Sequence, residues 1–223
     1  MQEFGCEAVL FDLDGVLVDS NVVVERIWRE WAGKFGIDAE RLIEVSHGRR
    51  SAEIIRLFAP DLDADSEARK LDKAEVEDLD GVLEIKGAGE LLSSLPKDGW
   101  KVVTSGTRSL ATKRMEHVGL PVPERFVSAD DVANGKPHPE PYLKGAELLG
   151  VRPEACVVVE DALNGVRAAK SAGMLAVAVA TTYRREDLSE ADAVANSLEE
   201  IVVTARTRSR GDDGLRFELR IAE

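Results

Sequence analysis

The sequence is poor in several residue types that particular classes of protein require. Its two cysteines, Cys6 and Cys156, lie in apolar segments, where buried reduced thiols are expected rather than a disulfide. Basic residues are in the minority, with 29 Lys and Arg against 42 Asp and Glu. The resulting formal charge of −13 argues against a nucleic-acid partner, which needs a basic face.

Long apolar runs are also missing. The longest reach strand length, far short of the ~20 residues that span a membrane. The N-terminal region contains acids and no stretch typical of a signal peptide. We therefore expect a cytoplasmic protein with no membrane partner, and a monomer by default. The length of 223 residues and the hydrophobic content of 44% suit one sizeable core plus a smaller domain.

The most informative segment is the one around Asp12 and Asp14. An apolar run at residues 8–11 ends in these two carboxylates, and Gly15 opens a turn directly after them. Two like charges at the end of a buried strand cost several kcal/mol unless a divalent cation or a shared proton neutralises them. The pair therefore predicts a magnesium site, and a reaction in which one carboxylate attacks while the other carries a proton.

Short apolar runs alternate with amphipathic stretches along the chain, which is typical of a parallel sheet covered by helices. The predicted strands are residues 8–10, 101–104, 125–128, 155–159 and 175–180, and the predicted helices are about 110–118, 141–149 and 164–172. A glycine follows each of these helices, at positions 119, 150 and 173, as expected for helix C-terminal caps. The pattern predicts an α/β protein.

Two segments depart from this alternation. Residues 19–85 contain apolar positions at helical spacing and no convincing strand, so they are predicted to form a second, helical domain. Within them, the acidic stretch at residues 61–80 is interpreted as a solvated helix face without chemistry. The tail predicts a hairpin with strands at 202–204 and 215–219 and a turn at 212–214.

Four loops after predicted strands carry the candidate site residues, which would converge at the carboxyl ends of the strands. They are Asp12 and Asp14, then Thr104, Ser105 and Gly106, then Lys136, then Glu160 and Asp161. Each loop has a simpler explanation when taken alone. Ser105 or Thr107 could be a helix N-cap, Lys136 a surface lysine, and the last two acids a pair favoured by a helix N-terminus.

Together these motifs resemble those of the haloacid dehalogenase superfamily of phosphohydrolases, in the group whose helical cap is inserted after the first motif. The matching segments are residues 12–20 (DLDGVLVDS), 102–105 (VVTS), 135–137 (GKP) and 159–161 (VED). The resemblance covers essentially the whole chain. It implies a Rossmann-like parallel-sheet core made of residues 1–16 and 87–223, with a helical-bundle cap made of residues 17–86.

The resemblance implies a phosphatase that works through an aspartyl-phosphate. Asp12 would attack phosphorus, and Asp14 would protonate the leaving alkoxide and then take a proton from water. Superfamily members that cleave carbon–halogen bonds lack a metal and do not need the second carboxylate, and those that cleave phosphonates use a lysine of the cap. The presence of Asp14 therefore favours hydrolysis of phosphate esters.

The resemblance also assigns residues to the phosphoryl group and to a metal. The residues implied to hold the phosphoryl group or to orient the nucleophile are Thr104, Ser105, Gly106 and Lys136. The implied metal ligands are Asp12, the backbone carbonyl of Asp14, Asp161, and Glu160 either directly or through water. A set made only of oxygen ligands suits Mg²⁺, and no cluster of His or Cys suits zinc.

The implied substrate is a small phosphorylated metabolite that the cap recognises. Residues 46–51 (SHGRRS) resemble a segment of the sugar-phosphate and glycerol-phosphate phosphatases of this superfamily. This interpretation places Arg49, and secondarily His47 or Arg50, at the hydroxyls or phosphate of the substrate. The alternative is a helix N-cap at Ser51 with solvated arginines.

Two other functions are weighed against the phosphatase. A sugar phosphomutase uses the same four motifs, but in β-phosphoglucomutases a cap histidine aligns with Val24, and valine cannot donate a proton. A silent module that senses a phosphometabolite would not need Asp12 and Lys136, which are both present. Asn164 is a further candidate, either as a substrate contact or as a helix cap.

Overall fold

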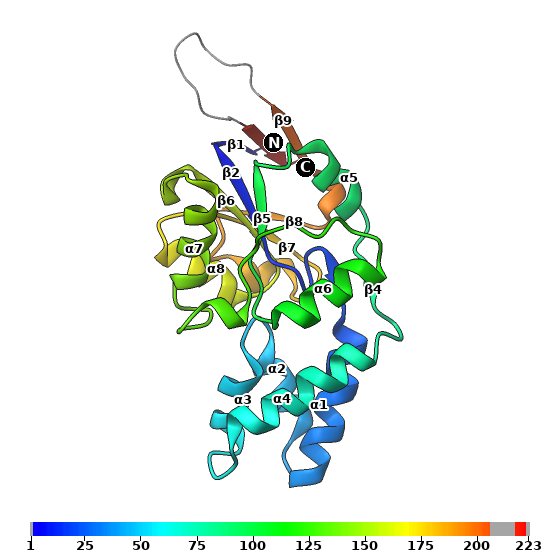
Figure 1. Cartoon of the computed structure of the whole chain (residues 1–223). Coiled ribbons are helices and arrows are strands. Elements are labelled where there is room, and N and C mark those ends of the chain that lie inside the picture. The colour runs from blue at the N-terminus through cyan, green and yellow to red at the C-terminus, as the bar shows by residue number, and fades with distance from the viewer. Residues whose placement is uncertain (1, 206–216, 222–223) are drawn as a thin grey trace.

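The computed structural model describes residues 2–205 and 217–221 (Figure 1). The strands are β1 (Gln2–Cys6), β2 (Ala8–Phe11), β3 (Val18–Asp19), β4 (Leu83–Glu84), β5 (Trp100–Val102), β6 (Cys156–Glu160), β7 (Leu175–Val179), β8 (Ala193–Ala195), β9 (Ile201–Ala205) and β10 (Phe217–Ile221). The α-helices are α1 (Asn21–Phe35), α2 (Ala39–Ser46), α3 (Ser51–Phe58), α4 (Ala64–Glu77), α5 (Ala88–Ser94), α6 (Arg108–His117), α7 (Glu140–Leu149) and α8 (Leu163–Ser171). Short 3₁₀ helices lie at Ala129–Asp131, Pro153–Ala155, Arg185–Leu188 and Leu198–Glu200.

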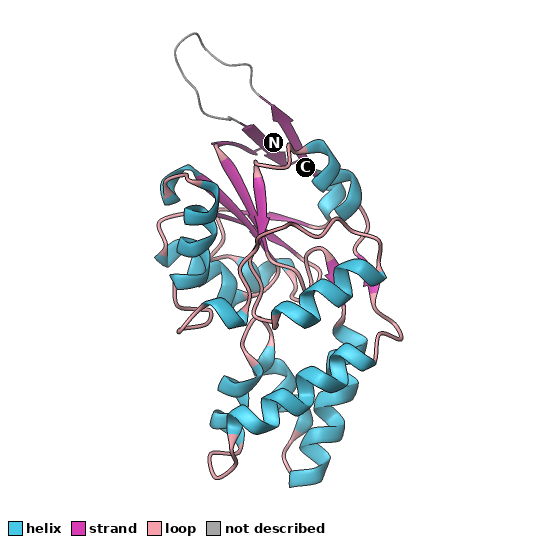
Figure 2. Ribbon diagram, viewed as in Figure 1, coloured by secondary structure: helices cyan, strands magenta, loops and turns pink. Residues whose placement is uncertain are grey.

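A parallel sheet with the strand order β5-β2-β6-β7-β8 forms the centre of the molecule (Figure 2). Its strands are apolar on both faces because helices cover both. Ala8 and Leu10 of β2 pack in one apolar cluster with residues of α7 and α8, whereas Val9 and Phe11 pack in another with residues of α5 and α6. The α/β fold predicted from the alternating pattern is confirmed.

Most of the predicted elements form at or near their predicted positions. Gly119, Gly150 and Gly173 have positive φ angles of 77°, 68° and 77° at the ends of α6, α7 and α8, as their position after each helix predicts. The strand predicted at residues 125–128 is wrong. Within the described residues, Val127 of that segment forms only an isolated bridge with Val103, the residue after β5, and no ladder of paired residues. The sequence pattern also does not reveal β8, a short strand at the edge of the sheet.

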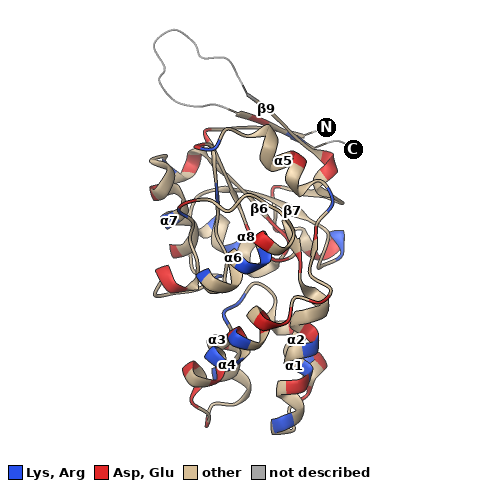
Figure 3. Ribbon diagram, turned by 45° about the vertical axis from the view of Figure 1, so that its right-hand side comes forward, with Lys and Arg blue, Asp and Glu red and all other residues tan. Residues whose placement is uncertain are grey.

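Helices α1–α4 lie between β3 and β4 and form a separate group at the bottom of Figure 1. The apolar residues predicted at helical spacing form its interior: Ile27, Trp28 and Trp31 are buried, and the two indoles meet edge-to-face with their centroids 5.5 Å apart. Acidic and basic residues alternate on the outside of α1 (Figure 3), where Arg29 pairs with Glu25. The fold class of a parallel-sheet core with an inserted helical bundle is confirmed, although β3 and β4 pair where no strand is predicted.

A small antiparallel sheet with the order β1-β10-β9 packs at the end where the termini lie (Figure 1). The pairing of β9 with β10 confirms the predicted hairpin strands, while residues 212–214, the predicted turn, lie outside the described residues. β1 is not predicted, because its pairing of Gln2 with Ile221 joins opposite ends of the chain.

Two further predictions concern the thiols and the membrane. Cys6 and Cys156 are both free and buried, as predicted, and burial raises the pKa of each thiol to about 12. Across the part of the chain that the structure describes, no helix combines the length and the apolar character needed to cross a membrane.

Candidate active site

The carboxyl ends of three adjacent strands bring the predicted motifs together. Asp12 directly follows β2, Thr104 comes shortly after β5, and Glu160 is the last residue of β6. Because β2 lies between the other two strands, these residues meet at one edge of the sheet, where open α/β folds bind ligands. All three residues are buried.

Lys136 reaches the same edge from the loop before α7. It is fully buried, so the explanation of a surface lysine is wrong. Its Nζ lies 2.9 Å from Asp12 Oδ1 and 2.7 Å from Glu160 Oε1, and it donates to the Val103 carbonyl at 3.2 Å. Burial acts to lower the pKa of Lys136, but the two carboxylates outweigh it and raise the pKa above its usual value. The ammonium therefore remains charged.

Both carboxylate oxygens of Glu160 accept hydrogen bonds. Oε1 accepts from Lys136 and from the Tyr142 hydroxyl, each at 2.7 Å, and Oε2 accepts from the N–H groups of Asp161 at 2.9 Å and Ala162 at 3.0 Å. Although burial acts to raise it, Lys136 and these hydrogen bonds hold the pKa of Glu160 below its usual value. Glu160 is therefore ionised and holds Lys136 in place. Its bonds from the Asp161 and Ala162 N–H groups also place it at the N-terminus of α8, as the simpler explanation expects.

Three buried carboxylates form a group that could hold a metal ion. Asp12, Glu160 and Asp161 each place an oxygen within 4.8 Å of the others, and the Lys136 ammonium lies beside Asp12 and Glu160. Burial raises the pKa of Asp12 to about 8, and it raises the pKa of Asp161 well above its usual value. Gly15 has a φ of 81°, and a Cβ there would lie 2.0 Å from Asp161 Oδ2. The raised pKa values reflect the cost of ionising these buried carboxylates together without a further cation, and this close set of hard oxygen atoms fits Mg²⁺.

Asp14 is held by donors on the other side of the loop. Its Oδ1 accepts from Ser20 Oγ at 2.8 Å and from Arg114 Nη1 at 2.7 Å. Arg114 is itself 2% exposed and donates through Nη2 to Glu75 of α4 at 2.6 Å. Both bonds to Asp14 end on one oxygen, and Oδ2 has no hydrogen-bond partner within residues 2–205 and 217–221.

Thr104, Ser105 and Gly106 form the turn between β5 and α6. Thr104 Oγ1 accepts from the Gly106 N–H at 3.0 Å, and Ser105 Oγ donates to the Gly48 carbonyl of the inserted helices at 2.8 Å. Thr107 is the N-cap of α6, one of the two residues proposed for that role from the sequence, and its side chain accepts a backbone hydrogen bond in the first turn.

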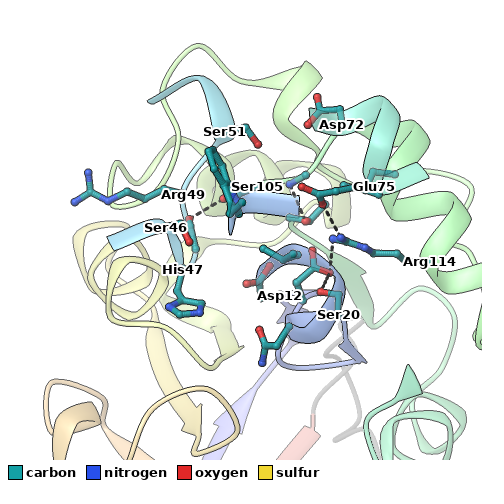
Figure 4. Close-up of a pocket in the computed structure, with 18 of the residues that line it drawn as sticks. Asp12, Ser20, Ser46, His47, Arg49, Ser51, Asp72, Glu75, Ser105 and Arg114 are labelled. Atoms are coloured by element: carbon teal, nitrogen blue, oxygen red, sulfur yellow. Dashed lines mark hydrogen bonds and ion pairs between the residues drawn. The ribbon is translucent and has the colours of Figure 1, made fainter. Parts of the chain in front are cut away.

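A pocket lies between this edge of the sheet and the inserted helices (Figure 4). The predicted site residues that line it are Asp12, Asp14, His47, Arg49, Thr104, Ser105, Gly106 and Asp161. Val24 and Trp28 of α1 also line it. In Figure 4 the guanidinium of Arg49 points away from Asp12, so this arrangement does not direct it at the reacting end of the pocket.

Two other residues singled out from the sequence join the inserted helices to the core. Arg50 donates to two backbone carbonyls of the loop that precedes α7, at 3.3 and 3.1 Å. Arg50 is also the N-cap of α3, so the alternative of an N-cap at Ser51 with solvated arginines is wrong. Asn164 donates to the His47 carbonyl at 3.1 Å and lies inside the first turn of α8, so it is not the helix cap and is not among the pocket-lining residues.

Comparison with known proteins identifies the family. Residues 6–173 match the model of the haloacid dehalogenase-like hydrolases. The chain belongs to that family. Hexitol phosphatase A of Escherichia coli is 43% identical over 204 residues, which cover 89% of this chain and 94% of that protein. Glycerol-1-phosphate phosphohydrolase 2 of Saccharomyces cerevisiae is 41% identical over 195 residues, covering 82% of this chain and 78% of that protein.

Solved structures of this hydrolase family share the fold. CbbY from Rhodobacter sphaeroides, crystallised with phosphate, superposes with a TM-score of 0.74 at 28% identity and covers 87% of this chain and 96% of that chain. β-Phosphoglucomutase from Clostridium difficile superposes with a TM-score of 0.76 at 27% identity, covering 86% of this chain and 92% of that chain. The resemblance inferred from the four motifs is confirmed.

The acidic stretch at residues 61–80 contributes two residues to the pocket, so its interpretation as a solvated helix face is wrong for Glu75. Asp72 and Glu75 of α4 both line the pocket, and Glu75 is 4% exposed. A signal was present in the sequence, because Glu75 continues the stripe of buried alanine and leucine residues along α4. A carboxylate in such a stripe requires a buried partner, which here is Arg114.

Proposed function

We propose that this hydrolase cleaves small phosphate monoesters of sugars or polyols, with Mg²⁺ and through an aspartyl-phosphate on Asp12. The observation that supports this most strongly is the 2.9 Å contact between the buried Lys136 and Asp12, which lines the pocket together with Asp161. The relatives named as a hexitol phosphatase and a glycerol-1-phosphate phosphohydrolase support the substrate class.

In the first step Asp12 is the nucleophile. One of its carboxylate oxygens bonds to phosphorus, and the P–O bond of the ester breaks. Asp14 gives its proton to the leaving alkoxide, so that a free alcohol departs and the aspartyl-phosphate remains. Oδ2 of Asp14 is the oxygen that carries this proton, because Ser20 and Arg114 both donate to Oδ1.

In the second step Asp14, now ionised, accepts a proton from water. The water oxygen bonds to phosphorus and the bond to Asp12 breaks, which releases inorganic phosphate and restores the carboxylate of Asp12. Both steps use Asp14 on the same atom, so its orientation by Ser20 and Arg114 matters for each of them.

The remaining core residues stabilise charge. Thr104, Ser105 and Gly106 line the pocket and would hold the phosphoryl oxygens. The Lys136 ammonium faces Asp12, so it orients the nucleophile and offsets negative charge that builds on the phosphoryl group.

Mg²⁺ would be held by the carboxylates of Asp12 and Asp161 and by the backbone carbonyl of Asp14. Glu160 would reach it through water, because its oxygens already accept bonds from Lys136, Tyr142 and two backbone N–H groups. When bound, the ion supplies positive charge that favours the ionised nucleophile and the transferring phosphoryl group.

We further propose that residues 17–86 act as a cap over the pocket and that residues 1–16 and 87–223 form the catalytic core. Supporting contacts between the two parts include the hydrogen bond from Ser105 to the Gly48 carbonyl and the ion pair between Arg114 and Glu75. A cap held in this way would exclude water from the reacting groups and would contact the leaving group.

A phosphate-release assay over a panel of sugar and polyol phosphates, with Mg²⁺ and with EDTA, tests the proposal. We expect turnover that requires the metal and that Asp12→Asn abolishes. Asp98→Asn makes the same chemical change at an exposed position and should leave turnover intact. Activity that survives in Asp12→Asn would show that the nucleophile is assigned to the wrong residue.

A sugar phosphomutase is the alternative, because β-phosphoglucomutase shares the fold. Val24 lines the pocket at the position where the resemblance places a histidine in those enzymes, and its side chain cannot transfer a proton. Incubation with glucose 1-phosphate and a bisphosphate primer separates the two functions. Isomer formation that outpaces phosphate release would favour the mutase.

A further inference from the structure

The end of the pocket remote from the nucleophile is built by the inserted helices. Figure 4 places Asp12 on the core side of the pocket and Asp72 near its opposite end. Trp28 of α1 and Ser51 of α3 line the same pocket. A phosphoryl group held at Asp12 therefore directs the leaving group of the ester toward this wall.

The positive charge of Arg114 is already neutralised within the wall. Its two terminal nitrogens donate to Asp14 at 2.7 Å and to Glu75 at 2.6 Å, and the residue is 2% exposed. The guanidinium of Arg49 points away from Asp12 toward the other side of the pocket from Asp72 (Figure 4). Neither arginine is therefore placed to pair with a second anionic group on a substrate.

Asp72, in contrast, is an acid without a partner. It lies one turn before Glu75 on α4, it is half-buried, and it has no hydrogen bond or ion pair among the described residues. Burial raises the pKa of Asp72 to about 6; the charge of Asp130 acts in the same direction and that of Arg114 acts against it. A carboxylate withdrawn from water without a donor is unfavourable, and a substrate hydroxyl can supply that donor.

We propose that Asp72 makes this pocket selective for esters with a neutral, polyhydroxylated leaving group, and that it disfavours esters whose leaving group carries a second negative charge. The proposal rests on the phosphatase activity proposed above. A hydroxyl of the leaving group donates to Asp72, whereas a carboxylate or second phosphate at the same place meets a like charge, and Arg114, the cation that acts on Asp72, already pairs with Asp14 and Glu75. Like charges set against each other are a strong source of discrimination.

Sorbitol 6-phosphate and 6-phosphogluconate form a matched pair of probes, because both are open-chain esters and they differ at the far end by a hydroxymethyl group or a carboxylate. We expect wild-type kcat/KM to favour sorbitol 6-phosphate by at least about tenfold, which corresponds to about 1.4 kcal/mol. Asp72→Asn should reduce this ratio by about tenfold, chiefly through a lower KM for 6-phosphogluconate.

Asp65→Asn is the control, because Asp65 is an exposed acid on the same helix and pairs with Arg56 outside the pocket. It should leave the ratio within about twofold of wild type. Equal wild-type kcat/KM values for the two esters would overturn the inference, as would a ratio that Asp72→Asn leaves unchanged. Failure of the proposed function looks different, because the wild-type protein with Mg²⁺ would then release phosphate from neither ester.

Discussion

Replacing Arg114 by methionine tests how the inserted helices are fastened to the core. Arg114 on α6 joins Asp14, which follows β2, to Glu75 on α4. Methionine keeps most of the apolar length of the side chain but removes both ion pairs. Glu75, whose side chain is 6% exposed, then has no cation beside it.

The stability that Arg114→Met loses depends on how deeply each unpaired carboxylate is buried. Removing one member of a buried ion pair costs about 3–5 kcal/mol of the free energy of unfolding. Asp14 keeps the hydrogen bond from Ser20 and its side chain is 29% exposed, so most of the loss comes from Glu75. The double variant Arg114→Met, Glu75→Leu removes that buried charge and should recover at least about 2 kcal/mol.

The loss of unfolding free energy in Arg114→Met should also depend on pH. Burial raises the pKa of Glu75 to about 7 even with Arg114 beside it, and losing the guanidinium would raise it further. A carboxyl group whose folded-state pKa is raised binds its proton more tightly when folded, so stability falls as the pH rises toward that pKa. The free energy of unfolding that Arg114→Met loses relative to wild type should therefore be larger at pH 8 than at pH 6.

Urea unfolding followed by tryptophan fluorescence measures these quantities, because Trp28 and Trp31 report on α1 and Trp100 reports on the central sheet. In the same variant kcat should fall by about tenfold, since Asp14 loses one of the two donors that orient it for general acid–base catalysis. A single variant that loses less than about 1 kcal/mol, or a double variant no more stable than the single one, would refute this reasoning.

The remaining predictions concern the close packing of Gly165 against Glu160 and the two buried thiols. Gly165→Ala would place a Cβ 1.6 Å from Glu160 Oε1, so we expect kcat/KM to fall by at least about a hundredfold and unfolding free energy by about 1–3 kcal/mol. Gly33→Ala, in open space on α1, should instead gain up to about 1 kcal/mol, and equal effects of the two substitutions in urea unfolding would contradict the packing argument. Cys6 and Cys156 should not react with Ellman's reagent at pH 8 until the protein is unfolded, because burial raises both pKa values to about 12; fast reaction of the native protein would contradict this.

The parts of the site that were predictable from the sequence are those that local patterns encode. A buried apolar run that ends in Asp12 and Asp14 has few explanations other than a charged site, and the order of the four motifs narrowed these to one family. The parallel sheet followed from short apolar runs between amphipathic stretches. In each case the residues that form the pattern lie within a short stretch of sequence that also forms the strand or the loop it predicts.

The parts that were missed depend on contacts between distant segments. The ion pair of Glu75 with Arg114 joins residues 39 positions apart, and the pattern of each helix alone does not reveal the partner. The pairing of β1 with β10 likewise joins the two ends of the described chain. Residues 125–128 include the strand-forming pair Phe126 and Val127, but only Val127 bridges to Val103, and the chain turns into a 3₁₀ helix at Ala129.

Trapping the phosphoenzyme shows whether Asp12 becomes phosphorylated during turnover. The wild-type protein would be mixed with Mg²⁺ and a hydrolysed ester labelled in its phosphate, quenched with acid within one turnover, and digested for peptide mapping. We expect a label, stable in acid, on the peptide that contains Asp12 and on no peptide of an Asp12→Asn sample. Turnover that releases labelled phosphate without any labelled Asp12 peptide would contradict it.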